Sequence, residues 1–114
     1  MKIYDLIDES GHAYAFEVGN IALSRRDACE LASTVAGVQI TRRPRRWGLD
    51  DDEFCEFAIN GVTFVIWEPF GDNSRFWVGP QPLRPVPELA AVRDVFAKAK
   101  PVWFPTLRRW MHNL

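Results

Sequence analysis

The dipeptide Asn60-Gly61 constrains the fold of this chain more than any other feature of its sequence. Asn-Gly favours a two-residue type I′ turn, which joins two antiparallel strands. Such a turn fixes the register of the hairpin, because residues equally distant from it lie opposite each other. We therefore expect one entirely apolar face, made by three facing pairs: Ile59 with Val62, Phe57 with Phe64, and Cys55 with Ile66.

The opposite face of this predicted hairpin is mixed in character. It carries aromatic residues together with residues typical of exposed positions: Phe54, Glu56, Ala58, Thr63, Val65 and Trp67. We expect the apolar face to pack on helices, because a sheet of this kind commonly buries one face only. A second face that stays partly apolar is often used for binding.

The remaining elements follow from local signals. Residues 2–7 and 12–18 are rich in β-prone side chains and predict a second hairpin. Ser24 can cap a helix whose apolar stripe is Ala28, Leu31, Ala32 and Val35. Short strands are predicted at 38–40 and 75–78, and a second helix at about 87–100. Strands and helices are thus segregated, which predicts an α+β fold: an antiparallel sheet of about five or six strands with helices packed on one face.

Length and composition limit the possible architecture and location. The chain has 114 residues, of which 47% are hydrophobic, so we expect a single domain over residues 1–114 with a substantial core. The first residues contain no apolar stretch like that of a signal peptide, and no window is as long as a membrane span. We therefore expect a cytoplasmic protein. In that compartment Cys29 and Cys55 are expected to be reduced and inert, each acting as a small buried hydrophobe.

A basic run suggests one kind of partner. Four arginines and a tryptophan lie close together and could grip phosphates while the indole stacks on a base: Arg42, Arg43, Arg45, Arg46 and Trp47. The net charge of the whole chain is −1, however, and nucleic-acid-binding domains are normally clearly basic. A solvated loop explains the same run, so nucleic acid is the less favoured partner.

An acidic run follows directly and consists of Asp50, Asp51, Asp52 and Glu53. A carboxylate cluster can mimic phosphates, occupy the basic cleft of a nuclease and speed association with it. The same residues can equally be a polar lead into the next strand that prevents edge pairing. The run lacks the spacing and glycine of a calcium loop, so we expect no metal here.

The chain contains five tryptophans, which is many for its length. All five can be packed in the core. Alternatively, Trp67 and Trp77, on neighbouring predicted strands, or Trp47 beside its arginines, form an interface hot spot, because tryptophan is enriched at such positions.

The sequence contains no motif typical of catalysis. A glycine-rich phosphate loop and a serine nucleophile elbow are both missing. His12 and His112 could form an acid–base pair that cleaves RNA, but two surface histidines are the simpler interpretation. We therefore expect no enzymatic activity and no cofactor.

The segment Glu68-Pro-Phe-Gly-Asp-Asn-Ser-Arg-Phe-Trp-Val-Gly-Pro80 resembles segments of small bacterial proteins from toxin–immunity loci. In size and style the chain is similar to immunity proteins of contact-dependent inhibition and related polymorphic-toxin systems. The resemblance implies a compact cytoplasmic binder that neutralises one cognate toxin domain, often a nuclease. The predicted partner-binding residues are Asp50, Asp51, Asp52, Glu53, Glu56, Trp67 and Trp77.

Overall fold

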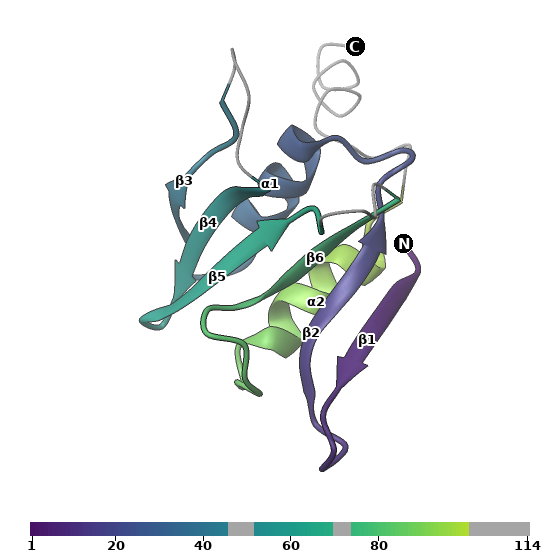
Figure 1. Ribbon diagram of the computed structural model, residues 1–114. Helices are drawn as coiled ribbons and strands as arrows, with labels where there is room; N and C mark the ends of the chain where they lie inside the picture. Colours follow the sequence, from purple (N-terminus) through teal and green to yellow (C-terminus); the bar gives the residue numbers. More distant parts are fainter. Residues whose placement is uncertain (46–51, 70–73, 101–114) are drawn as a thin grey trace.

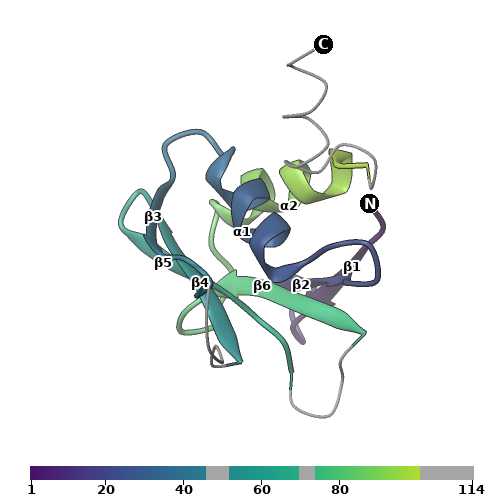
Figure 2. The same cartoon turned by 90° about the horizontal axis from the view of Figure 1, so that it is seen from above.

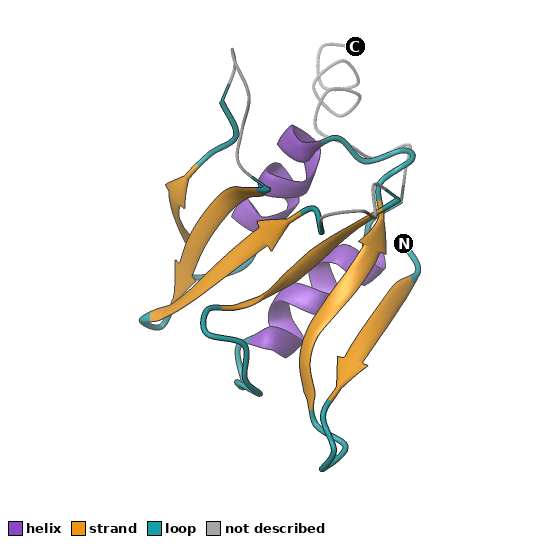
Figure 3. Ribbon diagram, in the orientation of Figure 1, coloured by secondary structure: helices purple, strands orange, loops and turns teal. Residues whose placement is uncertain are grey.

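The computed structural model describes residues 1–45, 52–69 and 74–100 (Figure 1). These residues form a six-stranded antiparallel sheet, in the order β1-β2-β6-β5-β4-β3, together with two helices. The elements are β1 (Ile3–Ile7), β2 (Ala13–Gly19), α1 (Arg25–Ser33), β3 (Gln39–Arg42), β4 (Glu53–Ile59), β5 (Val62–Trp67), β6 (Arg75–Pro80) and α2 (Leu89–Lys98). The α+β prediction is confirmed, and Figure 3 shows the segregation of strands and helices.

The Asn-Gly hairpin has the predicted geometry. Asn60 has a φ of 50° and Gly61 a φ of 78°, so both central residues are in the positive region that a type I′ turn requires. β4 and β5 pair in the expected register: Cys55 with Ile66, Phe57 with Phe64, and Ile59 with Val62. The local turn signal was therefore sufficient to predict which residues of β4 and β5 lie opposite each other.

A β-bulge in β4 makes one prediction wrong. The register shifts between Glu53, which faces Trp67, and Cys55, which faces Ile66. Phe54 is the additional residue, and the bulge breaks the alternation of side chains that placed it on the mixed face. It is instead fully buried, with its ring centroid 4.9 Å from that of Phe76.

Strand β6 connects the two halves of the sheet. It pairs with β5 on one side and with β2 on the other, so Val78 faces both Ile66 and Phe16. The N-terminal hairpin and the Asn-Gly hairpin therefore belong to one continuous sheet, whose edge strands are β1 and β3. β3 reaches Arg42, two residues beyond its predicted end, and so includes the first arginine of the basic run.

Both helices lie on the same side of the sheet (Figure 2). The Ser24 Oγ accepts a hydrogen bond from the backbone N–H of Asp27 at 3.1 Å, which confirms the predicted cap. The predicted stripe of α1 is buried: Ala28, Leu31, Ala32 and Val35. Helix α2 is fastened to β1 by Arg93, whose Nε and Nη2 donate to the Asp5 carboxylate at 2.7 and 2.9 Å. These hydrogen bonds to Asp5 raise the pKa of Arg93.

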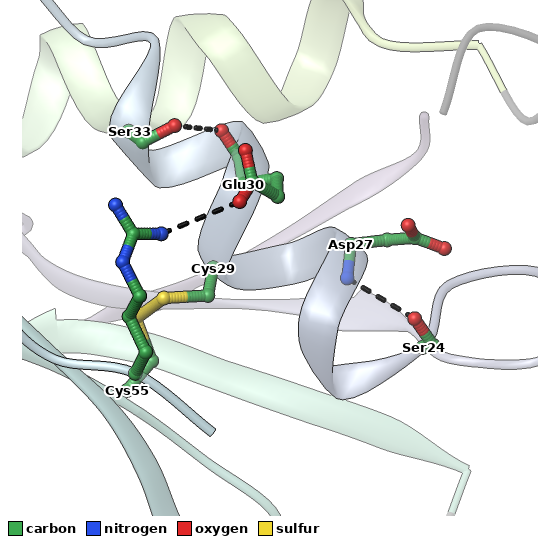
Figure 4. Close-up of polar contacts among 7 residues, drawn as sticks. Ser24, Asp27, Cys29, Glu30, Ser33 and Cys55 are labelled. Atoms are coloured by element: carbon green, nitrogen blue, oxygen red, sulfur yellow. Dashed lines mark hydrogen bonds and ion pairs between the residues drawn. A yellow bond between two sulfur atoms is a disulfide. The ribbon is translucent and has the colours of Figure 1, made fainter. Parts of the chain in front are cut away.

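The two cysteines are joined, which corrects the expectation that they are separate, reduced thiols. Cys29 of α1 and Cys55 of β4 form a disulfide, and their Cα atoms are 5.8 Å apart (Figure 4). Helix α1 packs directly on β4, so that the buried sides of the two elements bring the sulfur atoms together. The bond links a helix to the sheet within the core, where both residues are inaccessible to solvent.

Phenylalanines dominate the layer between the helices and the sheet. Phe57 and Phe64 stack with ring centroids 5.3 Å apart, and Phe16 meets Phe96 of α2 edge-on at 5.5 Å. All four side chains are fully buried. Offset and edge-on contacts of this kind add to the stabilisation from burial alone.

Candidate partner-binding face

The side of the sheet away from the helices is the outer face of this protein. No helix of the described residues covers it (Figure 2). The registers place on this face the side chains that alternate with the core: Tyr4, Leu6, Ala15, Glu17, Glu53, Glu56, Ala58, Thr63, Val65, Trp67, Arg75 and Trp77. Aromatic, aliphatic and charged residues are therefore mixed on a surface that neither α1 nor α2 covers.

Trp67 and Trp77 form the centre of the outer face. They lie directly opposite each other on β5 and β6, and their ring centroids are 5.4 Å apart at an interplanar angle of 53°. Both side chains are half-buried. The Nε1–H of Trp77 is buried without a hydrogen-bond acceptor among the described residues. Two adjacent tryptophans with this partial exposure have the composition of an interface hot spot.

A charged cluster borders the tryptophan pair. Arg75 Nη1 lies 2.9 Å from Glu17 Oε2, and the guanidinium carbon lies 3.6 Å from the centroid of the Tyr4 ring. Glu17 in turn faces Trp77 across β2 and β6. The sequence alone does not reveal this cluster, because only the pairing of β2 with β6 brings Arg75 beside Glu17 and Tyr4.

A pocket of about 160 Å³ opens beside Trp67. Its lining comes from β4, β5, the end of β6 and the segment that follows it: Glu53, Val65, Trp67, Pro80, Gln81 and Leu83. The chain after β6 turns so that Leu83 lies over the backbone of Gly79, while its side chain stays 44% exposed. Leu83 thus forms one wall of the pocket and remains accessible from solvent.

Gly79 permits this arrangement because it has no side chain. A Cβ atom at this position would lie 2.8 Å from the Ala15 Cβ and 3.1 Å from Leu83 Cδ2. We expect Gly79→Ala to lower the free energy of unfolding by about 2 kcal/mol, because overpacking forces neighbours apart. Chemical denaturation measures the loss, and Gly19→Ala on β2, where a Cβ meets nothing within 4 Å, is the matched control. Equal stability of the two variants would contradict the close packing at Gly79.

The predicted acidic residues are only partly described. Glu53 and Glu56 lie on β4 with their side chains on the outer face, and Glu53 lines the pocket. Asp52 is exposed, and its carbonyl oxygen accepts a hydrogen bond from the Glu68 N–H at 2.9 Å. Asp50 and Asp51 lie outside the described residues. The structure therefore gathers four of the predicted residues on one face: Glu53, Glu56, Trp67 and Trp77.

The predicted basic run does not form one surface within the described residues. Arg42 donates to the Glu53 carbonyl oxygen at 2.8 Å, beside β4. Arg43 instead lies 3.3 Å from Glu30 of α1, so its charge is directed toward the helix layer. Arg45 is exposed, whereas Arg46 and Trp47 lie outside the described residues. Two of these arginines are thus paired with glutamates on different elements.

No group of three or more histidines, cysteines or carboxylates that could hold a metal is found in the described parts of the chain. His12 is exposed in the turn between β1 and β2, with Nδ1 3.9 Å from Asp8 Oδ1, and His112 lies outside the described residues.

No helix in the part of the chain that the structure describes is long and apolar enough to cross a membrane. Comparisons with protein-family models, with curated proteins and with solved structures found no match to this chain.

Proposed function

We propose that this protein is a non-enzymatic immunity protein that binds and neutralises a cognate toxin domain through its outer face. The observation that carries the proposal is the Trp67–Trp77 pair, half-buried on a sheet face that no described helix covers and bordered by Arg75. The few residues that carry most of the binding energy at protein interfaces are enriched in tryptophan, tyrosine and arginine. The outer face gathers all three.

The carboxylates of β4 favour a basic protein partner. Glu17 is paired with Arg75, whereas Glu53 and Glu56 lie together on β4, and carboxylates repel the phosphates of nucleic acid while attracting basic surfaces. The adjacent pocket, at about 160 Å³, is smaller than the roughly 300–1,000 Å³ typical of sites for drug-sized ligands. A protein with a basic cleft, such as a nuclease domain, has the complementary chemistry.

The resemblance of residues 68–80 to toxin–immunity proteins supports the choice of a toxin as partner. Part of this segment forms β6, the strand that carries Trp77 and Arg75. The likeness and one tryptophan of the pair, Trp77, therefore fall on the same strand. An immunity protein that meets a nuclease inside the cell acts in the cytoplasm, and we propose that location.

The Cys29–Cys55 disulfide provides a test of the proposed cytoplasmic location, because disulfides are rare in cytoplasmic proteins. The state of Cys29 and Cys55 can be measured by quenching cells in acid and then alkylating free thiols under denaturing conditions, because both residues are buried in the folded chain. If the chain is cytoplasmic, both cysteines are expected to be free thiols in the cell and therefore to be alkylated. A closed disulfide would instead favour an oxidising compartment and a toxin that acts there.

Trp67→Ala tests the proposed interface. Loss of a central tryptophan is expected to weaken toxin binding by about 30-fold or more, which corresponds to a hot-spot residue. Calorimetric titration with the purified toxin domain measures the change. Lys98→Ala, on the exposed surface of α2 beyond the sheet, is the control and should bind as the native protein does. Equal affinity of the Trp67 variant and the native protein would exclude the outer face as the binding site.

The acidic run has its own test. The triple variant Asp50→Asn, Asp51→Asn and Asp52→Asn keeps side-chain size while removing three charges. We expect slower association with a basic toxin, most clearly at low salt, because complementary charges steer encounter. Stopped-flow measurement at two salt concentrations gives the rates. Unchanged association and unchanged protection of cells would remove the acidic run from the proposed interface.

A further inference from the structure

We propose that the pocket beside Trp67 binds a single arginine side chain of the partner protein. The identity of the partner rests on the function proposed above, whereas the chemistry of the pocket rests on its own lining. Three features carry the inference: the size of the pocket, its charge, and two arrangements of the same kind elsewhere in the chain.

The size of the pocket suits one long side chain. Its volume is about 160 Å³. An apolar cavity of roughly 150 Å³ in another protein holds one benzene molecule, so this pocket has room for a planar group of that size. The walls are mostly apolar, from Val65, Trp67, Pro80 and Leu83. Such walls fit the aliphatic stem of a long side chain.

The charge of the pocket favours a cation. Among the described residues that line the pocket, Glu53 is the one that carries a charge, and Gln81 is the other polar member. The Glu53 side chain is 45% exposed, and its nearest ion-pair partner in the described part of the chain, Arg42 Nη2, is 3.9 Å from Oε2. This is well beyond the roughly 2.7–2.9 Å of a strong charge-assisted hydrogen bond. The carboxylate can therefore accept hydrogen bonds from an incoming donor.

The chain itself shows how an arginine fits between an aromatic ring and a carboxylate. Arg75 lies over Tyr4 at 3.6 Å and pairs with Glu17 at 2.9 Å. On the other side of the sheet, Arg25 lies over Phe54 at 4.9 Å and pairs with Glu68 at 3.3 Å.

Trp67 and Glu53 face each other across β4 and β5, and both line the pocket. They form a third pair of ring and carboxylate, here with an accessible space beside it. Arginine suits this space better than lysine, because the planar guanidinium stacks on an indole and presents two parallel donors to a carboxylate. The proposed function places this arginine on the basic surface of the toxin.

The test uses Nα-acetyl-arginine methylamide as the probe and needs no toxin. Nuclear magnetic resonance follows the indole N–H of Trp67 and the backbone amides of Glu53 and Gln81 during titration. We expect saturable shifts with a Kd on the order of 1 mM, as suits a single side chain. The corresponding citrulline derivative, which has the same shape without the charge, is expected to cause no saturable shift. The lysine derivative is expected to bind more weakly than the arginine derivative.

Two variants make the test specific. Glu53→Gln is expected to weaken binding of the arginine probe at least fivefold. Glu9→Gln removes the same charge from the exposed turn between β1 and β2 and does not line the pocket, so it should bind the probe as the native protein does. Equal binding of the citrulline probe, an unchanged Kd in Glu53→Gln, or tighter binding of lysine would overturn the proposal, as would the absence of any shift.

Failure of this proposal is distinguishable from failure of the proposed function. If the probe does not bind but Trp67→Ala still loses the toxin, the outer face binds its partner without an arginine in the pocket. If the probe binds but Trp67→Ala keeps full affinity for the toxin, the pocket recognises arginine and the interface lies elsewhere.

Discussion

Reduction of the Cys29–Cys55 disulfide is expected to lower the free energy of unfolding by about 3.5 kcal/mol, for a cross-link that closes a loop of this length. The two cysteines are 26 residues apart in sequence, and the bond restricts the unfolded chain over that distance. Urea denaturation of the native protein with and without reductant measures the difference. The same chain serves in both conditions, so no side chain is lost from the core.

A double variant supplies the control for this experiment. Cys29→Ala with Cys55→Ala should unfold at the same urea concentration with and without reductant. The native protein should lose stability only when reductant is present. Identical midpoints for the native protein in both conditions would contradict a stabilising cross-link between α1 and β4.

Phe64→Ala is expected to lower the free energy of unfolding by about 4 kcal/mol, the usual cost of truncating a buried phenylalanine. Phe64 is 0% exposed in strand β5 and stacks on Phe57 at 5.3 Å. The truncation removes apolar burial and leaves a cavity between the helices and the sheet. The free energy of unfolding of such domains is about 5–15 kcal/mol, so the variant loses a large part of its stability.

The matched control is Ile21→Ala. Ile21 is a large aliphatic residue that is 97% exposed, so its truncation should change stability by less than about 0.5 kcal/mol. Thermal and urea denaturation of both variants would measure the contrast. Similar small losses in the two variants would contradict the placement of Phe64 in the core.

The parts of the fold that were predicted correctly depend on local signals. Asn60-Gly61 defines a turn, and the turn alone fixes which residues of β4 and β5 face each other. The cap at Ser24 and the stripe that follows it likewise need only a few consecutive residues. Six strands with both helices on one side agree with the predicted architecture.

The wrong predictions depend on contacts between distant segments. The bulge that buries Phe54 adds a residue to β4 without any residue type that marks it in the sequence. The pairing of Cys29 with Cys55 requires α1 to pack on β4, and the sequence predicted the buried side of each element but not their meeting. The alternation of side chains along a strand and the spacing of apolar residues along a helix describe one element at a time. They therefore do not predict which elements come into contact.

In the candidate site, too, local signals predicted some features, whereas others depend on contacts between distant segments. Trp67 and Trp77 were predicted to lie on neighbouring strands, and they face each other across β5 and β6. The cluster of Arg75, Glu17 and Tyr4 was missed, because it needs β2 beside β6. The pocket also needs Leu83 to lie over Gly79, which no local pattern indicates.

The central claim is that the outer face binds a toxin, and one recovery experiment tests it most directly. Tagged native protein, Trp67→Ala and Lys98→Ala are each recovered from the cells that make the protein, after nuclease treatment, and their bound proteins are identified by mass spectrometry. The partner's gene is then expressed alone and together with each of the three proteins. We predict a partner that stops growth when expressed alone, is retained and neutralised by the native protein and Lys98→Ala, and is lost by Trp67→Ala. A partner that is harmless alone, or one that Trp67→Ala retains and neutralises fully, would contradict the claim.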